Sequence, residues 1–178
     1  SSCTVYGQAD KLPVTEDAPF KQAESPYGNT KQVNEEIIRD TCAVVPAIKA
    51  ISLRYFNPIG AHESALIGEL PNGVPQNLIP YITQTAIGLR ESLSVYGDDY
   101  PTPDGTCIRD YIHVVDLAEA HLAALEYILQ GKIQGNYEVF NVGTGKGSSV
   151  LEVIKAFEKV SGQSLPYKIV DRRAGDVI

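Results

Sequence analysis

The sequence predicts an α/β fold with parallel strands, because short apolar strands alternate with amphipathic helices along its 178 residues. Residues 49–56 (KAISLRYF) and 137–142 (YEVFNV) have the apolar, β-branched and aromatic character of buried strands. Helix start signals separate them. The length is enough for one domain with a core, or for one and a half small lobes.

Four helices are predicted. Ser25-Pro26 begins the first, since serine can cap free N–H groups and proline suits the first helical position, and it runs to about residue 42. A second covers residues 78–89. Asp116 is predicted to cap a third, with apolar positions at helical spacing up to Ile128. Ser149-Val150-Leu151-Glu152 is a capping-box pattern that opens a fourth, which ends near Gly162.

The remaining elements are short. Residues 2–6 are apolar enough to be the end of a strand, and residues 94–97 (SVYG) predict a strand followed by a turn. A last strand is expected at 167–170. Residues 7–24 are polar with prolines, and residues 58–77 carry glycine or proline every few positions, so both should be loops.

Composition and charge exclude several classes of protein. The net charge is −7 and the 15 lysines and arginines are scattered, so no basic stripe for nucleic acid is present. No run approaches 18 apolar residues, so no membrane span is expected. Three widely spaced cysteines and three histidines offer neither a disulfide framework nor a metal-ligand spacing. With no signal peptide visible, we expect a cytoplasmic protein without a metal.

Tyr27 and Lys31 form the pattern that carries chemistry. Four residues apart on a helix, they share one face, one turn from each other. A free phenol loses its proton near pH 10, and a nearby ammonium favours the phenolate. Ser2, at the tip of the preceding strand, could hold a substrate oxygen against the phenol. Together they would transfer a proton from an alcohol under oxidation. Alone, the pair is also consistent with a plain surface contact.

With this pair and Ser2 read as part of six motifs in order, the chain resembles the extended short-chain dehydrogenase/reductase family, and within it the enzymes that epimerise nucleotide sugars at C4. The motifs cover the chain from end to end. They are residues 1–7 (SSCTVYG), 25–31 (SPYGNTK), 54–62 (RYFNPIGAH), 75–82 (PQNLIPYI), 104–114 (DGTCIRDYIHV) and 172–176 (RRAGD).

The resemblance implies NAD as cofactor and the interconversion of UDP-glucose and UDP-galactose through a 4-keto sugar. Tyr27 would take the proton of the 4-hydroxyl while NAD⁺ takes the hydride of C4. Lys31 would keep Tyr27 ionised and contact the nicotinamide ribose, and Ser2 would relay the proton. These three residues and Phe56 are thus the expected cofactor contacts. Cys3 and Thr4 stand where related 4,6-dehydratases carry a carboxyl pair, so dehydration is disfavoured.

The same resemblance implies a set of residues that bind the UDP-sugar, besides Ser2 and Tyr27. Asn57 and Arg109 have structural alternatives, namely the end of a strand and an ion pair with Asp110 or Asp116. Leu78 and Phe56 are also expected to be core residues. The expected substrate contacts are Asn57, Asn77, Leu78, Ser94, Val95, Tyr96, Arg109, Arg173 and Asp176.

The fold that the resemblance implies is a partial doubly wound, Rossmann-like parallel sheet at residues 1–60, followed by a smaller mixed α/β substrate-binding lobe at 61–178. The strand at 137–142 is a candidate to rejoin the first sheet. We expect the chain to be the C-terminal half of the enzyme, without the N-terminal dinucleotide-binding half. Residues 142–149 (VGTGKGSS) lack the Gly-x-Gly-x-x-Gly spacing and are interpreted as a structural turn.

The resemblance has two further implications for function, and two alternatives stay open. The complete enzyme should be a homodimer, and the fragment alone should be inactive. An epimerase of UDP-N-acetylhexosamines or of another nucleotide sugar is an alternative within the same class. A non-catalytic relative that only binds sugar nucleotides is a second alternative, against which the intact set of Tyr27, Lys31 and Ser2 speaks.

Overall fold

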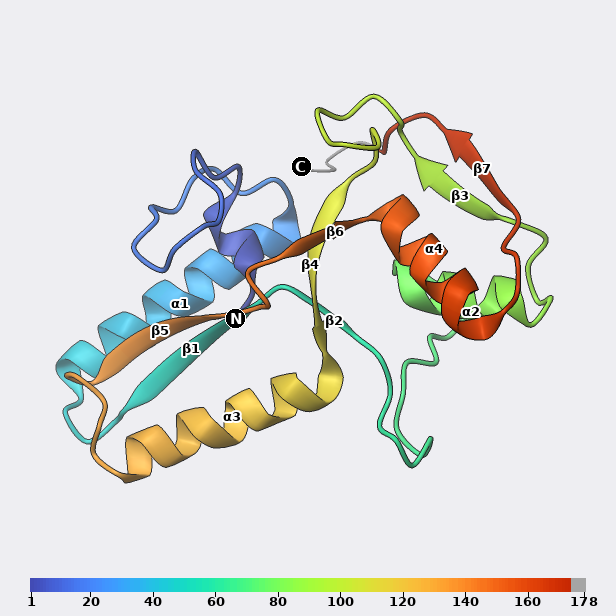
Figure 1. Cartoon of the computed structure of the whole chain (residues 1–178). Coiled ribbons are helices and arrows are strands. Elements are labelled where there is room, and N and C mark those ends of the chain that lie inside the picture. The colour runs from blue at the N-terminus through green and yellow to red at the C-terminus, as the bar shows by residue number, and fades with distance from the viewer. Residues whose placement is uncertain (174–178) are drawn as a thin grey trace. The chain divides into compact units, whose positions relative to one another are not determined.

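The computed structural model describes residues 1–173, which fall into two compact units (Figure 1). The first unit contains residues 1–58 and 112–145, and the second contains residues 59–111 together with the chain from Lys146 onward. The chain therefore passes between the units three times. The strand at 137–142 belongs to the first unit, and so does the helix that precedes it in the sequence.

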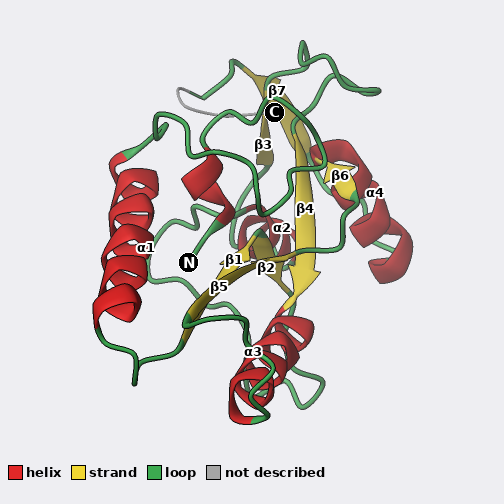
Figure 2. Ribbon diagram, turned by 90° about the vertical axis from the view of Figure 1, so that its left-hand side faces the viewer, coloured by secondary structure: helices red, strands yellow, loops and turns green. Residues whose placement is uncertain are grey.

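A parallel strand pair forms the centre of the first unit. β1 (Ala50–Tyr55) lies beside β5 (Tyr137–Val142), with Ala50 opposite Tyr137 and Tyr55 opposite Val142. Helices α1 (Pro26–Val44) and α3 (Val114–Leu129) cover opposite faces of the pair (Figures 1 and 2). Helices on both faces of parallel strands are the doubly wound arrangement, so the predicted fold class is confirmed.

The two faces of β1 differ in chemistry because successive side chains of a strand point to opposite sides. Leu53 is buried in a cluster with Ile112 and Val142, against which Leu117 and Ala120 of α3 pack. Ser52 and Arg54 point to the other face, toward α1, and both are also buried. One face of the strand is therefore an ordinary apolar core, and the other is polar.

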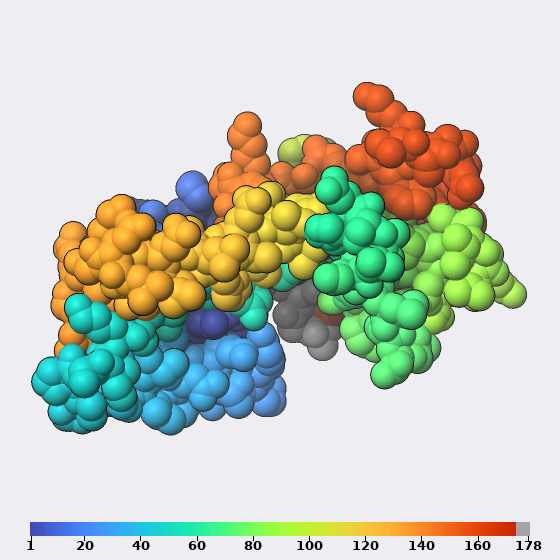
Figure 3. Space-filling view, turned by 90° about the horizontal axis from the view of Figure 1, so that it is seen from below, coloured from blue at the N-terminus to red at the C-terminus, as the bar shows by residue number. Residues whose placement is uncertain are grey.

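The outer surface of α3 is apolar as well. Leu122, Leu125 and Leu129 are more than half exposed, and the helix (yellow to orange) lies at the surface in Figure 3. Within the described residues, no helix is long and apolar enough to cross a bilayer.

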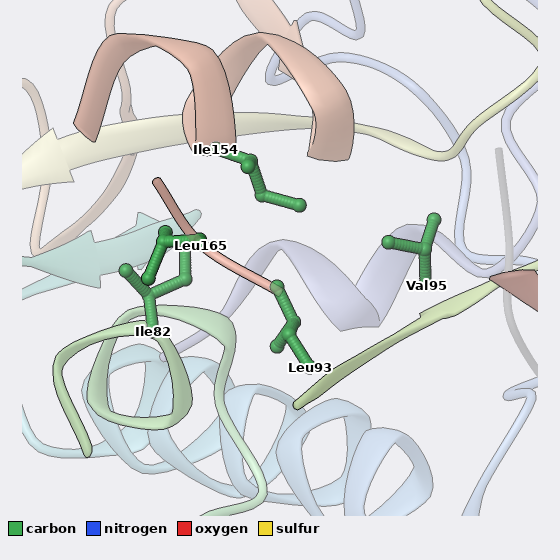
Figure 4. Packing of buried hydrophobic residues seen from close by; sticks show 5 residues of the cluster. All are labelled: Ile82, Leu93, Val95, Ile154 and Leu165. Atoms are coloured by element: carbon green, nitrogen blue, oxygen red, sulfur yellow. The ribbon is translucent and has the colours of Figure 1, made fainter. Parts of the chain in front are cut away.

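The second unit is built around a second parallel pair. β3 (Leu93–Tyr96) lies beside β7 (Tyr167–Val170), and α2 (Leu78–Ala86) and α4 (Val150–Ser161) pack on it. Figure 4 shows the side chains from these elements converging into one core. Its buried members are Ile82, Leu93, Val95, Ile154 and Leu165.

Three short strands lie near the points where the chain changes unit. They are β2 (Asn57–Ile59), β4 (Ile108–His113) and β6 (Gly147–Ser149). β4 and β6 are antiparallel, with Ile108 opposite Ser149. None of the three was predicted. Residues 143–146 form a bend between β5 and β6, where the sequence predicts a structural turn.

The predicted helix starts are right at two of three capped helices. Ser25 Oγ accepts a hydrogen bond from Gly28 N at 3.1 Å, and Ser149 with Glu152 makes a complete capping box. The prediction of Asp116 as a cap was wrong. β4 runs directly into α3, so His113 caps the helix by accepting from Val115 N, and Asp116 lies in the first turn, where its charge suits the helix dipole. Helix α2 ends at Ala86, three residues earlier than predicted.

The predicted strand end at residues 2–6 is correct only at Ser2, which makes an isolated parallel bridge with Tyr55. Residues Cys3–Tyr6 form the 3₁₀ helix η1 instead. Ser2 Oγ starts this turn by accepting from Thr4 N at 3.3 Å. Gly7 ends it with a φ of 60°, where an added Cβ would lie 2.6 Å from the carbonyl oxygen of Gln22. Polar capping thus overrides the strand propensity of this short segment.

Candidate active site

Tyr27 and Lys31 lie on the first two turns of α1, as their spacing predicts. The Lys31 ammonium nitrogen is 5.1 Å from the centroid of the Tyr27 ring, close enough for cation–π attraction. The Tyr27 side chain is half exposed, with 52% of its surface accessible. Helix α1 therefore presents a phenol to solvent with a positive charge held beside it.

The first turn of α1 is seated directly on η1. Gly28 is buried, and an added Cβ there would lie 3.3 Å from the Thr4 carbonyl oxygen, so the absence of a side chain permits this close approach. Gln32 Nε2 donates to the Val5 carbonyl at 2.8 Å and to the Lys21 carbonyl at 2.7 Å. The helix that carries Tyr27 is thus fastened to the segment that carries Ser2.

Ser2, Phe56 and Asn57 lie at the carboxyl end of β1. Ser2 is only 6% exposed, and its Oγ accepts from Thr4 Oγ1 at 3.1 Å. Phe56 N donates to the Val142 carbonyl at 3.1 Å, which holds the chain at the end of the parallel pair. The carboxyl end of parallel strands is where ligands bind in open α/β sheets. The first unit therefore gathers the predicted catalytic residues beside one strand end.

A buried ion pair, which was not predicted from the sequence, joins β1 to α1. Arg54 Nη2 donates to Glu35 Oε2 at 2.6 Å, and the two side chains are 6% and 4% exposed. Arg54 Nη1 also donates to the hydroxyl of Tyr6 at 2.8 Å. The signal in the sequence was an arginine inside a buried strand, but nothing in the sequence indicated its partners.

The contact between Glu35 and Arg54 shifts the pKa of each side chain. Burial alone would raise the pKa of Glu35, but hydrogen bonds from Arg54 and Ser1 and the charge of Arg54 outweigh it and lower that pKa. Burial acts to lower the pKa of Arg54, and its hydrogen bonds to Glu35 and Tyr6 raise it. Burial raises the pKa of Tyr6 itself. Both partners of the pair are therefore charged at neutral pH.

The second unit carries most of the predicted substrate contacts. Asn77 precedes α2 and its exposed amide Nδ2 donates to Glu69 Oε1 at 2.6 Å. Leu78 packs against the core cluster, as its structural interpretation predicts. On β3, Val95 is fully buried, whereas Ser94 is half-buried and Tyr96 is exposed. Only Ser94 and Tyr96 of this strand can present side chains to a ligand.

Arg173 and Tyr96 come together in this unit. The Arg173 guanidinium lies 4.4 Å from the centroid of the Tyr96 ring. Its neighbour Arg172 stacks on Tyr100 at 3.9 Å, and its Nε donates to Asp99 Oδ1 at 2.6 Å. That hydrogen bond lowers the pKa of Asp99.

Arg109 is half-buried on β4, and its Nη1 donates to the Ile108 carbonyl at 2.8 Å. Asp176 lies outside the described residues. Among residues 1–173, no three histidine, cysteine or acidic side chains are grouped as metal ligands would be.

A family model described as the NAD dependent epimerase/dehydratase family matches residues 1–143. The chain belongs to this family. Its relatives include a UDP-glucose 4-epimerase of Drosophila melanogaster, which is 56% identical over 177 residues, and one of Bacillus subtilis, which is 55% identical. These alignments cover 99% of the chain but only 50% and 51% of the relatives. The chain spans about half the length of the curated relatives it matches.

Solved structures of family members superimpose on the chain over nearly its whole length. A Bifidobacterium longum UDP-glucose 4-epimerase in complex with NAD⁺ and UDP has a TM-score of 0.92 at 51% identity. One from Stenotrophomonas maltophila, with NAD and a formylated UDP-arabinopyranose, has a TM-score of 0.93 at 52% identity. In both cases 99% of this chain covers 52% of the other.

The donor set of the first unit fits one end of the family's dinucleotide. Lys31 supplies a hydrogen-bonding cation and Tyr27 an exposed hydroxyl, and Phe56 is a partly exposed ring at the end of β1. These groups suit a ribose hydroxyl and a flat nicotinamide ring. The bend at residues 143–146 leads into strand β6 rather than into a helix, so it does not supply the helix N-terminus that cradles a pyrophosphate.

Proposed function

We propose that this chain carries the proton-transfer and substrate-binding residues of an enzyme that interconverts UDP-glucose and UDP-galactose, with NAD as its cofactor. The observation that carries the proposal is the placing of Lys31 over Tyr27 on a helix seated against the Ser2 segment. Membership of the family and the 56% identity to a UDP-glucose 4-epimerase support it.

In this mechanism Tyr27, as phenolate, removes the proton from the sugar 4-hydroxyl, and Lys31 stabilises the negative charge of the phenolate. Ser2 orients the reacting oxygen by a hydrogen bond. When bound, NAD⁺ would supply the acceptor and then the donor for the hydride at C4 of the sugar. The 4-keto sugar turns over between these steps, and Tyr27 returns the proton to the oxygen of the inverted alcohol. Protons and electrons balance over one turnover, so no outside oxidant is needed.

The nucleotide part of the substrate is assigned to a further set of residues in this proposal. Asn57 supplies an amide at the end of β1, and Asn77 and Leu78 stand at the start of α2. Ser94 and Tyr96 face away from the core of the second unit, and Val95 contributes backbone only. Arg109 and Arg173 supply charge-assisted hydrogen bonds to the diphosphate. Asp176 is proposed as a ribose contact.

A wider substrate range is the second candidate. A UDP-Glc/GlcNAc 4-epimerase of Campylobacter jejuni is 42% identical to the chain, with a TM-score of 0.74. Turnover of UDP-galactose and UDP-N-acetylgalactosamine, measured side by side, separates the two candidates. We further propose that the enzyme works as a homodimer in the cytoplasm.

The test compares two proteins. The 178 residues alone should show no turnover, because they contain no glycine loop for the pyrophosphate of NAD. A chimera that joins them behind the N-terminal half of the Drosophila relative should convert UDP-galactose to UDP-glucose. Tyr27→Phe in this chimera should lower kcat by at least about a hundredfold, which is the usual contribution of a general base. Unchanged turnover in Tyr27→Phe would refute the mechanism, and epimerisation by the chain alone would refute the predicted inactivity.

A further inference from the structure

The Glu35–Arg54 pair belongs to a buried polar cluster that joins four segments of the first unit. Glu35 comes from α1, Arg54 from β1, Tyr6 from η1, and Tyr137 and Asn141 from β5. The Tyr6 hydroxyl accepts from Arg54 and donates to Asn141 Oδ1 at 2.6 Å. The Tyr137 hydroxyl lies 3.3 Å from Glu35 Oε2 and 2.9 Å from Ser52 Oγ. We define these contacts as the Arg54 cluster.

The geometry of the cluster is highly constrained. Arg54 uses Nε and Nη2 on the carboxylate of Glu35 and Nη1 on Tyr6, and its guanidinium also stacks on the rings of Tyr6 and Phe20 at 4.8 and 5.0 Å. Because the guanidinium is planar and three of its nitrogens donate hydrogen bonds, its partners must keep fixed positions around it. Burying an ion pair contributes little net stability compared with apolar residues of similar volume, so we assign the cluster the role of fixing geometry.

That fixed geometry acts on the candidate active site. Tyr27, Lys31 and Glu35 are spaced by four residues, so they follow one side of α1 at successive turns. Tyr6 follows Ser2 by four residues in the short η1 segment, and Arg54 directly precedes Tyr55, the bridge partner of Ser2. A shift of α1 along its axis would therefore break the cluster and move Tyr27 relative to Ser2.

We propose that Glu35, Arg54 and Tyr6 are positioning residues, which fix α1 against β1 and η1 and so set the distance from the Tyr27 phenol to the Ser2 hydroxyl. The proposal rests on the proposed function for its catalytic consequence. Its structural consequence, the seating of α1 on η1, stands independently. A displacement of about 1 Å in a catalytic group can lower a rate about a hundredfold, so the cluster need not touch the substrate to control kcat.

Two variants test the cluster in the NAD-loaded chimera. Glu35→Gln removes the charge and keeps the shape, and Tyr6→Phe removes one hydroxyl and keeps the ring that stacks on Arg54. Glu36→Gln is the matched control, because it is the same change at the next, exposed position of α1. We expect Glu35→Gln to lower kcat about ten- to a hundredfold, with KM for UDP-galactose changed less than about twofold. Tyr6→Phe should lower kcat less, and Glu36→Gln not at all.

A double-variant cycle and hydrogen exchange complete the test. Because Tyr6 and Glu35 act through Arg54, their combined effect on kcat should be smaller than the product of the two single effects. Mass-spectrometric hydrogen exchange should rise in the peptides that cover η1 and the first turns of α1 in Glu35→Gln, and remain unchanged in Glu36→Gln. Each kcat is divided by the fraction of folded, NAD-loaded protein, so that a mere loss of stability does not count.

Each outcome decides between the two proposals. Unchanged normalised kcat and unchanged exchange in Glu35→Gln would overturn the positioning role. A loss of normalised kcat and raised exchange at η1 would support it. An inactive unsubstituted chimera would overturn the proposed function, and the exchange comparison would then decide whether the cluster seats α1.

Discussion

The Lys31 ammonium nitrogen lies 5.1 Å from the centre of the Tyr27 ring, one helical turn away on α1. This single contact depends only on local geometry, since a well-capped helix places residues four apart on one face. The contacts of the neighbouring residues depend on the fold: Gly28 follows Tyr27, Gln32 follows Lys31, and both contact η1. The helix therefore presents Tyr27 and Lys31 together and packs on η1 through the residues that follow them.

The charge of Lys31 is predicted to matter more than its bulk. Lys31→Met keeps the length of the side chain and removes the ammonium, so the proposed proton transfer through Tyr27 loses the positive charge beside the ring. In the chimera we expect kcat to fall roughly a hundredfold, within the usual range of general acid–base catalysis. Lys132→Met, which removes an exposed lysine outside the site, should leave kcat unchanged. Equal activity of both variants would contradict the role of Lys31.

The ionisation of Glu35 should appear in the pH dependence of stability. Its pKa in the folded chain lies below the 4.5 of an exposed glutamate, because the bonds and charge of Arg54 outweigh burial. A depressed pKa contributes stability that is complete above pH 4.5 and is lost as the pH falls through the folded value. Glu35→Gln should therefore unfold more easily at pH 7, by about 2 kcal/mol, and the difference should shrink only as the pH falls below 4.5.

Urea titrations of the wild-type chain and Glu35→Gln at a series of pH values measure this difference in the free energy of unfolding. Glu36→Gln, at an exposed position, should stay within about 0.5 kcal/mol of wild type throughout. A gap between wild type and Glu35→Gln that is constant from pH 7 to pH 3 would show that the carboxylate charge is not what the cluster uses.

Local signals predicted much of the fold and part of the site. Ser25 and Ser149 cap helices because each cap needs only residues within one turn, and the spacing of Tyr27 and Lys31 is equally local. The Arg54 cluster could not be predicted, because its partners lie 19 and 48 residues away and meet only through the fold. The cap at His113 was missed because β4 passes into α3 without a loop.

Gly7 should tolerate no side chain. Its φ of 60° with a ψ of −140° is a sparsely populated conformation that costs a residue with a Cβ about 1–3 kcal/mol, and the added atom would also lie 2.6 Å from the Gln22 carbonyl oxygen. Gly73 is the comparison position, since its φ of 77° is also positive while nothing lies within 4 Å of the added atom. Chemical denaturation should show a larger loss for Gly7→Ala than for Gly73→Ala. Equal losses would mean that the loop at Gln22 moves aside.

The contact of Arg173 with Tyr96 leads to a prediction about UDP binding. The guanidinium lies 4.4 Å from the ring centre at the exposed end of β3, so the ring orients a cation that could reach a diphosphate. Calorimetric titration of the chimera with UDP should give a Kd about ten- to a hundredfold weaker for Arg173→Ala, because a charge-assisted hydrogen bond is lost. Tyr96→Phe keeps the ring and should bind nearly as well as wild type, whereas Tyr96→Leu should bind more weakly.

Arg90 provides the matched control for this prediction. Its guanidinium stacks on Tyr81 at 4.8 Å, so it makes the same kind of contact as Arg173 within the same unit. Arg90→Ala removes the same charge from the protein but lies outside the proposed substrate contacts. If both arginine variants weakened UDP binding equally, the effect would arise from net charge rather than from a specific contact. If only Arg173→Ala weakened it, with less effect at higher salt, the arginine would be acting on the charged diphosphate, since screening weakens exposed ionic contacts.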